Sequence, residues 1–201
     1  MVKVFMLIDL MFFTLFAFGQ TFEYVGVDKC KTCHRKADDG EQFPLWEKSN
    51  HANAFETLKS EASAKIAKEK GLTVPAYEAP ECLECHTTGF GEGGYEVKDD
   101  AFWNPADDDK DGASAVKRMA GLQAIGCESC HGPGSDYRKK KVMQSREESI
   151  KNGMNDILVS NGTAEKLCKT CHNEKSPTYK EFNFEEMWQK IAHPIPAGTE
   201  G

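Results

Sequence analysis

The pattern of hydrophobic and polar positions predicts short amphipathic helices separated by irregular segments. After residue 50, apolar side chains recur at three- and four-residue spacing on the same face as His51, with Ser49 or Asn50 available as a helix cap. Residues 60–70 form a second predicted helix, rich in Ala, Lys and Glu, which Gly71 ends.

Two more helices are predicted in the second half of the chain. Ser114 is suited to cap a short helix running through Leu122, and residues 184–191 form the last helix, before Pro194. Residues 89–94 are too rich in glycine for regular structure. Such a run favours either a close backbone approach to a flat ligand or a simple surface turn.

The longest apolar run lies at the N-terminus, from Leu10 to Phe18. It follows a single cation, Lys3, and leads into a small-x-small site at residues 17–19, which predicts a signal peptide over residues 1–19. Asp9 is unusual in such a segment, and the alternative is an uncleaved anchor. The run is too short to span a bilayer, so we expect residues 20–201 to be one exported domain without stable membrane insertion.

Every one of the eight cysteines falls in a C-x-x-C-H unit. The four units are Cys30, Cys33 and His34; Cys82, Cys85 and His86; Cys127, Cys130 and His131; and Cys168, Cys171 and His172. This spacing is the attachment signature of haem c, in which two thiols bind one porphyrin edge and the histidine binds the iron. Zinc is the alternative for paired C-x-x-C units, but four zinc half-sites each followed directly by histidine would be a coincidence. We therefore expect four covalent haem c groups.

Composition agrees with this expectation. The hydrophobic share of 39% in 201 residues is low for a globular chain, which predicts a thin protein core around bulky cofactors. The formal net charge is −7, and no basic face suited to nucleic acid is evident. A redox protein with a basic surface is the better electrostatic match.

Two charged segments carry weaker signals. Residues 107–112 match the first half of an EF-hand calcium loop, but the twelfth position is Arg118 in place of the bidentate Glu, which favours a solvated acidic turn. Residues 138–141 are all basic, and such a run faces haem propionates, an acidic partner or only solvent.

The chain resembles the tetrahaem cytochrome c-554 family and its exported multihaem relatives. The shared pieces are residues 24–26, the pattern Trp46-x-x-Ser49-x-His51-Ala52-x-Ala54, residues 89–91 with 94–95, and residues 126–134. The resemblance implies a mainly helical fold with little or no sheet, wrapped around four stacked haems and serving as an electron carrier. It also implies that His51 and His193 are distal haem ligands.

The chain departs from the family where a further distal histidine should follow the third motif. That loss removes the expected partner of the iron on His34, and Met143 lies in the same stretch as a replacement candidate. The resemblance further implies a five-coordinate iron on His86. The number of histidines also shows that not every iron can have two. Four irons would need eight axial histidines, and the chain has six. The irons on His131 and His172 are then the expected bis-histidine centres.

Three functional classes follow from these features. The first is a periplasmic or extracellular electron-transfer protein with redox protein partners, which axial closure of most irons favours. The second is a reductase of a small nitrogen or sulfur oxide at an open haem, although no catalytic constellation stands out. The third is a subunit of a polymeric cytochrome wire or a respiratory complex.

Overall fold

The computed structural model describes residues 21–194, and these residues form short helices joined by turns, with no strand. The mainly α prediction is therefore confirmed. The α-helices are α1 (Val27–Lys31), α2 (Gln42–Glu47), α3 (Ala54–Thr57), α4 (Glu61–Glu69), α5 (Pro80–His86), α6 (Asp100–Trp103), α7 (Lys110–Ala120), α8 (Cys127–His131), α9 (Lys140–Met143), α10 (Arg146–Lys151), α11 (Thr163–Cys168) and α12 (Phe184–Ile191). Two 3₁₀ helices cover Ala37–Asp39 and Asn50–Asn53.

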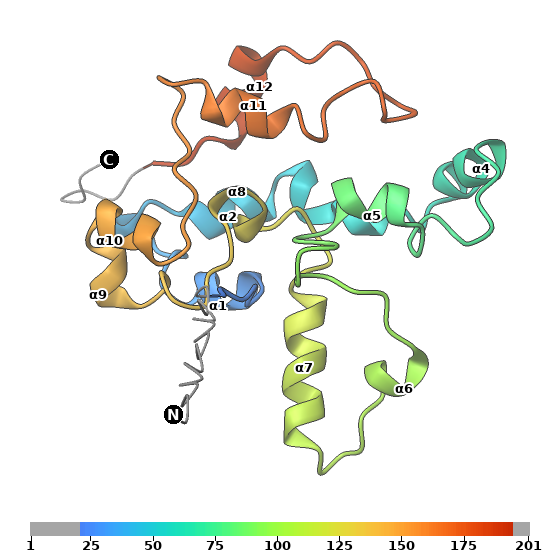
Figure 1. The fold of residues 1–201 in the computed structure, drawn as a ribbon, viewed down its shortest axis with the longest axis horizontal. Helices are drawn as coiled ribbons and strands as arrows, with labels where there is room; N and C mark the ends of the chain where they lie inside the picture. The colour runs from blue at the N-terminus through green and yellow to red at the C-terminus, as the bar shows by residue number, and fades with distance from the viewer. Residues whose placement is uncertain (1–20, 195–201) are drawn as a thin grey trace, which may run out of the picture.

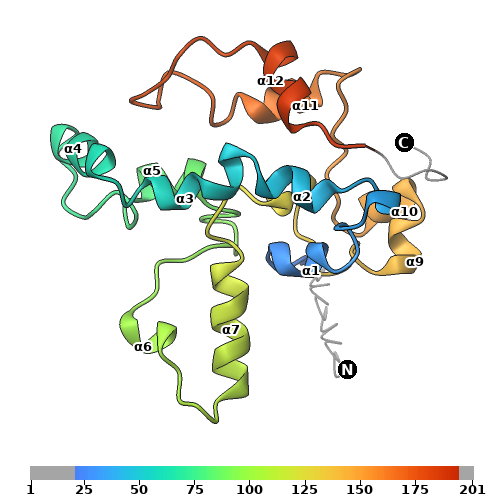
Figure 2. The ribbon, with the colours of Figure 1, turned by 180° about the vertical axis from the view of Figure 1, so that it is seen from behind.

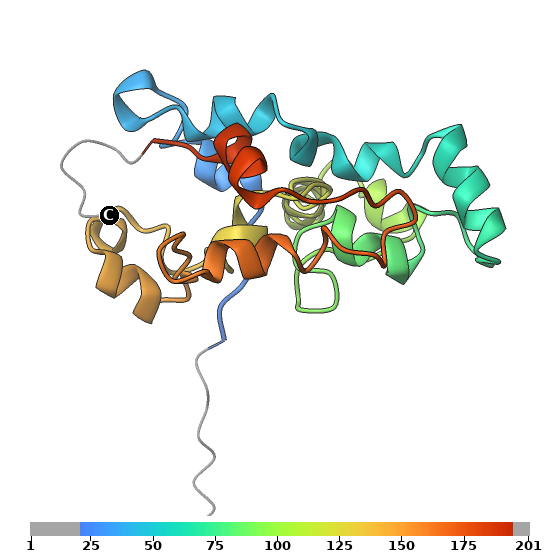
Figure 3. The same ribbon diagram turned by 90° about the horizontal axis from the view of Figure 1, so that it is seen from above.

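The helices form an elongated row with two side segments. In Figure 1, α9 and α10 lie at one end of the row and α4 at the other, with α2, α8 and α5 between them. The α6–α7 hairpin projects from one side of the row, and the segment carrying α11 and α12 runs along the opposite side, as the rear view also shows (Figure 2). Seen from above, α4 and the α9–α10 pair again mark the two ends (Figure 3).

Polar caps explain where several helices begin. Ser60 accepts a hydrogen bond from the backbone N–H of Ser63 at 3.2 Å and starts α4 within the predicted span of 60–70. Asn183 accepts from the N–H of Glu186 at 3.2 Å and starts α12, which matches the predicted span of 184–191.

One predicted helix start was wrong, and near His51 the predicted side-chain cap does not form. The helix assigned to a Ser114 cap begins five residues earlier, at Lys110, because the Asp109 carboxylate accepts from the Gly112 N–H at 2.8 Å and caps it. Asp109 of the acidic loop 107–112 therefore serves as the cap of α7. At His51 the chain forms a 3₁₀ turn before α3, and the Ser49 hydroxyl donates backwards to the Trp46 carbonyl at 2.6 Å instead of capping.

The hydrophobic core is small, as the composition predicts. Its least exposed large side chains are Leu83 and Leu122, with Phe55 packed beside Tyr95 at a ring-centroid distance of 5.4 Å. Six of the fifteen buried hydrophobic residues are alanines: Ala54, Ala67, Ala76, Ala79, Ala124 and Ala164.

The glycine-rich run 89–94 is a tight turn packed against the N-terminal segment. The N–H of Tyr95 donates to the Thr88 carbonyl at 2.9 Å and closes it. Gly89 has a φ of +68°, and a Cβ there would lie 2.7 Å from the Tyr24 ring. Glycine at this position therefore lets the backbone approach an aromatic ring of the chain itself.

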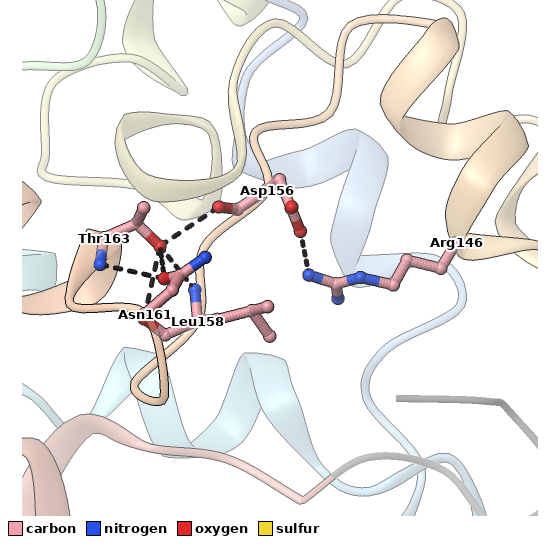
Figure 4. Close-up of polar contacts among 5 residues, drawn as sticks. All are labelled: Arg146, Asp156, Leu158, Asn161 and Thr163. Atoms are coloured by element: carbon pink, nitrogen blue, oxygen red, sulfur yellow. Dashed lines mark hydrogen bonds and ion pairs between the residues drawn. The ribbon is translucent and has the colours of Figure 1, made fainter.

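A compact turn fixes the helix that leads into the fourth motif. The Thr163 hydroxyl accepts from the Leu158 N–H at 2.7 Å, and the Thr163 N–H donates to the Asn161 side chain at 3.0 Å (Figure 4). Arg146 of α10 forms an ion pair with Asp156 at the start of this turn (Figure 4). The α9–α10 end of the molecule is thereby tied to α11.

No helix within residues 21–194 is long and apolar enough to cross a membrane. The predicted signal peptide at residues 1–19 lies outside the described residues.

Candidate functional site

The four C-x-x-C-H units each lie on or directly beside a short helix. The second unit ends α5 and the third makes up the whole of α8, whereas the first begins in α1 and the fourth begins at the last residue of α11. Helix α1 packs against α8, and the N–H of Val27 at the start of α1 donates to the Gly121 carbonyl at 3.2 Å. The first and third units are therefore neighbours in space.

None of the eight cysteines forms a disulfide, and none is fully buried. The side chains of Cys30 and Cys127 lie next to each other. The side chains of Cys85 and Cys171 are neighbours in the same way. Attachment points therefore meet in two pairs, the first unit with the third and the second with the fourth.

Both histidines outside the units stand opposite a unit histidine. The rings of His51 and His172 have centroids 6.0 Å apart, and those of His131 and His193 are 5.8 Å apart. Two imidazoles on one metal need two bonds of about 2 Å each plus the radius of each ring, which gives a centroid separation of about 6 Å. The spacing in both pairs is that of two axial ligands on one iron.

The pKa of the paired histidines favours the metal-binding form. Desolvation by burial, with the neighbouring His193, lowers the pKa of His131 to about 4. Burial and the nearby His172 also lower the pKa of His51. Neutral imidazole is the form that binds a metal, so these rings are prepared for ligation at neutral pH.

The two remaining unit histidines are fixed through Nδ1. That of His86 lies 2.6 Å from the Ala54 carbonyl oxygen, and that of His34 lies 3.2 Å from Oε1 of Gln42. An oxygen acceptor holds the proton on Nδ1 and leaves the Nε2 lone pair free for a metal. The His172 ring is oriented differently, by stacking on Phe182 at a centroid distance of 4.5 Å.

Met143 ends α9 and is half-buried. Gln42 contacts Nδ1 of His34, whereas an iron would bind Nε2. This contact therefore does not bear on the sixth ligand. Ligation by Met143 stays a prediction.

Glu128, inside the third unit, is a buried carboxylate that sequence reasoning missed. Only 3% of the residue is exposed, and its two oxygens accept the N–H groups of Val25 at 2.9 Å, Gly26 at 2.8 Å and Gly134 at 2.7 Å. The carboxylate thus joins the segment before the first unit to the loop after the third. A charged residue between two cysteines gives no sign of burial in sequence, because its backbone partners come from distant positions.

Thr88 is a second buried connection, just after the second unit. Its hydroxyl donates to the Ala124 carbonyl at 2.6 Å and accepts from the Gly126 N–H at 2.9 Å and the Ser129 hydroxyl at 3.0 Å. The N–H of Ile125 donates to the His51 carbonyl at 3.1 Å, which brings the distal-histidine segment to the same place. The second and third units and the distal-histidine segment therefore meet at Thr88.

These donors fit haem c and do not fit zinc. Thiol pairs precede each unit histidine, two imidazole pairs have the separation of axial ligands, and the other two histidines present Nε2. Across residues 21–194, no group of three or more His, Cys, Asp and Glu side chains is placed to hold a metal ion, as a zinc site would require. The class defined by this helical fold and these donors is a multihaem c-type cytochrome.

Comparison with known proteins agrees. The family model described as cytochrome c554 and c-prime matches residues 29–132, and the chain belongs to this family. It is 33% identical over 158 residues to cytochrome c-554 of Nitrosomonas europaea, covering 74% of this chain and 57% of that relative. A structure of reduced cytochrome c554 from Nitrosomonas europaea superposes with a TM-score of 0.58 at 24% identity, covering 90% of each chain. The cofactor of the chain is accordingly covalently attached haem c.

Proposed function

We propose that this chain is an exported electron carrier that holds four haem c groups. The observation that carries the proposal is the two pairs of opposed imidazoles, His51–His172 and His131–His193, because a closed bis-histidine iron exchanges electrons without binding substrate. Bound haem c supplies one-electron redox chemistry. The polypeptide supplies attachment, axial ligation and orientation.

Each unit has a defined role in this proposal. The two thiols of a unit attach one haem, and its histidine is the proximal ligand. His51 is then the distal ligand of the fourth unit, and His193 is that of the third. The same two histidines cannot serve the first and second units, so the irons on His34 and His86 have another sixth ligand or none.

Contacts between units support transfer along the chain. The Cys30–Cys127 contact places the attachment points of the first and third haems together, and the Cys85–Cys171 contact does so for the second and fourth. Thr88 and Ser129 connect the second unit to the third. Every attachment point therefore has a neighbour, as an electron carrier with several centres requires.

Export follows from the chemistry of attachment, which takes place outside the cytoplasmic membrane. Residues 1–19 serve as the signal peptide in this proposal, and residues 20–201 form the mature tetrahaem domain in the periplasm or outside the cell. The partners are redox proteins. The formal charge of −7, before any haem propionate is added, favours partners with a basic docking face.

Intact-mass spectrometry combined with a redox titration tests the proposal. The mature protein should show the mass of residues 20–201 plus four haems, and visible spectra should report reversible one-electron steps. The apo-protein mass, with or without zinc, would contradict it. A mass with fewer haems would identify a unit that is not loaded.

Ligand binding at the haem on His86 is a second candidate function. The observation that favours it is the use of both spare histidines elsewhere, while the His86 ring is held at Nδ1 by Ala54. Small diatomic gases bind an open ferrous iron, and such binding does not require turnover.

A further inference from the structure

Gln42, the first residue of α2, touches two segments that carry axial histidines. Its Oε1 lies 3.2 Å from Nδ1 of His34, and its Nε2 donates to the Pro194 carbonyl oxygen at 3.1 Å. His34 belongs to the first unit, whereas Pro194 directly follows His193, which faces His131 of the third unit. One side chain thus connects the ligands of two irons.

The chemistry of the two contacts fixes the orientation of the amide. A backbone carbonyl can only accept, so the Pro194 contact requires the NH₂ group of Gln42 on that side. Its oxygen then faces His34 and can only accept, which places the His34 proton on Nδ1. The result is a His34 tautomer with Nε2 free for iron, set by an acceptor of the kind that orients metal-bound histidines.

The second contact restrains His193. A residue before proline has a restricted backbone, and proline itself has a nearly fixed φ. A hydrogen bond on the Pro194 carbonyl therefore limits where the preceding imidazole can lie. His193 lies two residues past the end of α12, so this tether supplies a restraint that the helix does not.

The backbone at Gly40 leaves room for these two contacts of Gln42. Gly40 has a φ of +93°, and a Cβ there would lie 2.6 Å from Nε2 of Gln42 and 3.0 Å from the Pro194 oxygen. The N–H of Phe43 donates to the His34 carbonyl at 2.9 Å, which ties the start of α2 to the first unit. A glycine in the left-handed region is thus what lets the three segments meet.

We propose that Gln42 is a positioning residue that orients His34 on the first haem and holds His193 on the third. This inference rests on the proposed ligand assignment. An acceptor on the Nδ1–H of a proximal histidine strengthens the imidazole as a donor and lowers the potential of its iron. Loss of the Pro194 tether changes the angle of His193, which alters the low-spin signal of the iron on His131.

Two substitutions separate the contacts. Gln42→Leu removes both at similar volume. Gln42→Glu keeps an acceptor for His34 and strengthens it with charge, but places a second oxygen against the Pro194 carbonyl. Gln144→Leu, at an exposed glutamine after α9, is the matched control.

EPR-monitored redox titration of the holoprotein gives the readout, with the His34 signal assigned through His34→Met. Gln42→Leu should raise the potential of that iron and shift the low-spin signal of His131–His193. Gln42→Glu should lower the same potential while shifting the low-spin signal as Gln42→Leu does. The control should change neither.

Unchanged potential and signal in Gln42→Leu with all haems retained would overturn the inference. A change in only the potential, or in only the low-spin signal, would show that Gln42 acts on one of the two histidines and not on both. Failure of the ligand assignment is recognised separately, because His193→Ala would then leave the wild-type low-spin signal intact.

Discussion

The imidazole of His51 lies opposite that of His172 with ring centroids 6.0 Å apart, although the two residues belong to distant parts of the chain. His51 lies in a 3₁₀ turn, and its backbone carbonyl accepts a hydrogen bond from the Ile125 N–H at 3.1 Å. The ring of His172 stacks on Phe182. The backbone of His51 and the ring of His172 are therefore both held by contacts outside the pair. Such preorganisation is what a bis-histidine haem needs from its protein.

His51→Ala should convert one low-spin iron, the one on His172, to high spin, because its sixth ligand is lost. His193→Ala should do the same for the iron on His131. EPR of the oxidised protein counts these changes, and the double variant should lose two low-spin signals. Identical spectra in wild type and both single variants would show that the facing imidazoles do not share an iron.

Carbon monoxide should bind the fully reduced wild-type protein at the haem on His86, with a shift of part of the Soret band. The number of carbon monoxide molecules bound per protein should rise by one in His51→Ala or His193→Ala, because each substitution opens another iron. A gas titration followed by visible spectroscopy measures both numbers. Absence of any shift in the wild type, with a shift in either variant, would mean that the iron on His86 has a firm sixth ligand.

Met143→Leu should convert the iron on His34 from low to high spin if the thioether is its sixth ligand, since leucine keeps the volume and removes the sulfur. Met154→Leu is the control, because Met154 is also half-buried. EPR and the long-wavelength charge-transfer band of His/Met haem report the change. Matching spectra for the two variants would remove Met143 from the ligand set.

Glu128→Gln should lower the free energy of unfolding by about 2 kcal/mol, because the amide replaces one acceptor oxygen with a donor that faces backbone N–H groups. Glu84→Gln is the matched control, since Glu84 stands between the cysteines of the second unit and is exposed. Guanidinium unfolding of the holoproteins gives both values. Equal losses in the two variants would show that the buried hydrogen bonds contribute nothing specific.

Thr88→Val should also cost about 2 kcal/mol, because it keeps the shape of the side chain and leaves the Ala124 carbonyl and the Gly126 N–H without their partner. Thr73→Val, in an exposed loop, serves as the control. The same unfolding assay applies. Wild-type stability in Thr88→Val would indicate that water replaces the hydroxyl.

The sequence alone determined the cofactor chemistry and the helical character of this protein. A C-x-x-C-H unit is a local signal, since all of its reacting groups lie within five residues, and helices such as α4 and α12 follow from local caps and spacing. The sequence predicted the start of α7 too late, because Ser114 and Asp109 are both acceptable caps. Only the hydrogen bond from the Gly112 N–H identifies Asp109 as the cap.

The tertiary structure decided which histidines meet and what holds them. His51 and His193 could be named as spare ligands by elimination, but their partners His172 and His131 depend on packing between segments far apart in sequence. Gln42 and Glu128 gave no sequence signal, because the backbone groups that they bind are brought near only by folding. Chain periodicity encodes local structure, whereas these contacts are set by how short helices pack together.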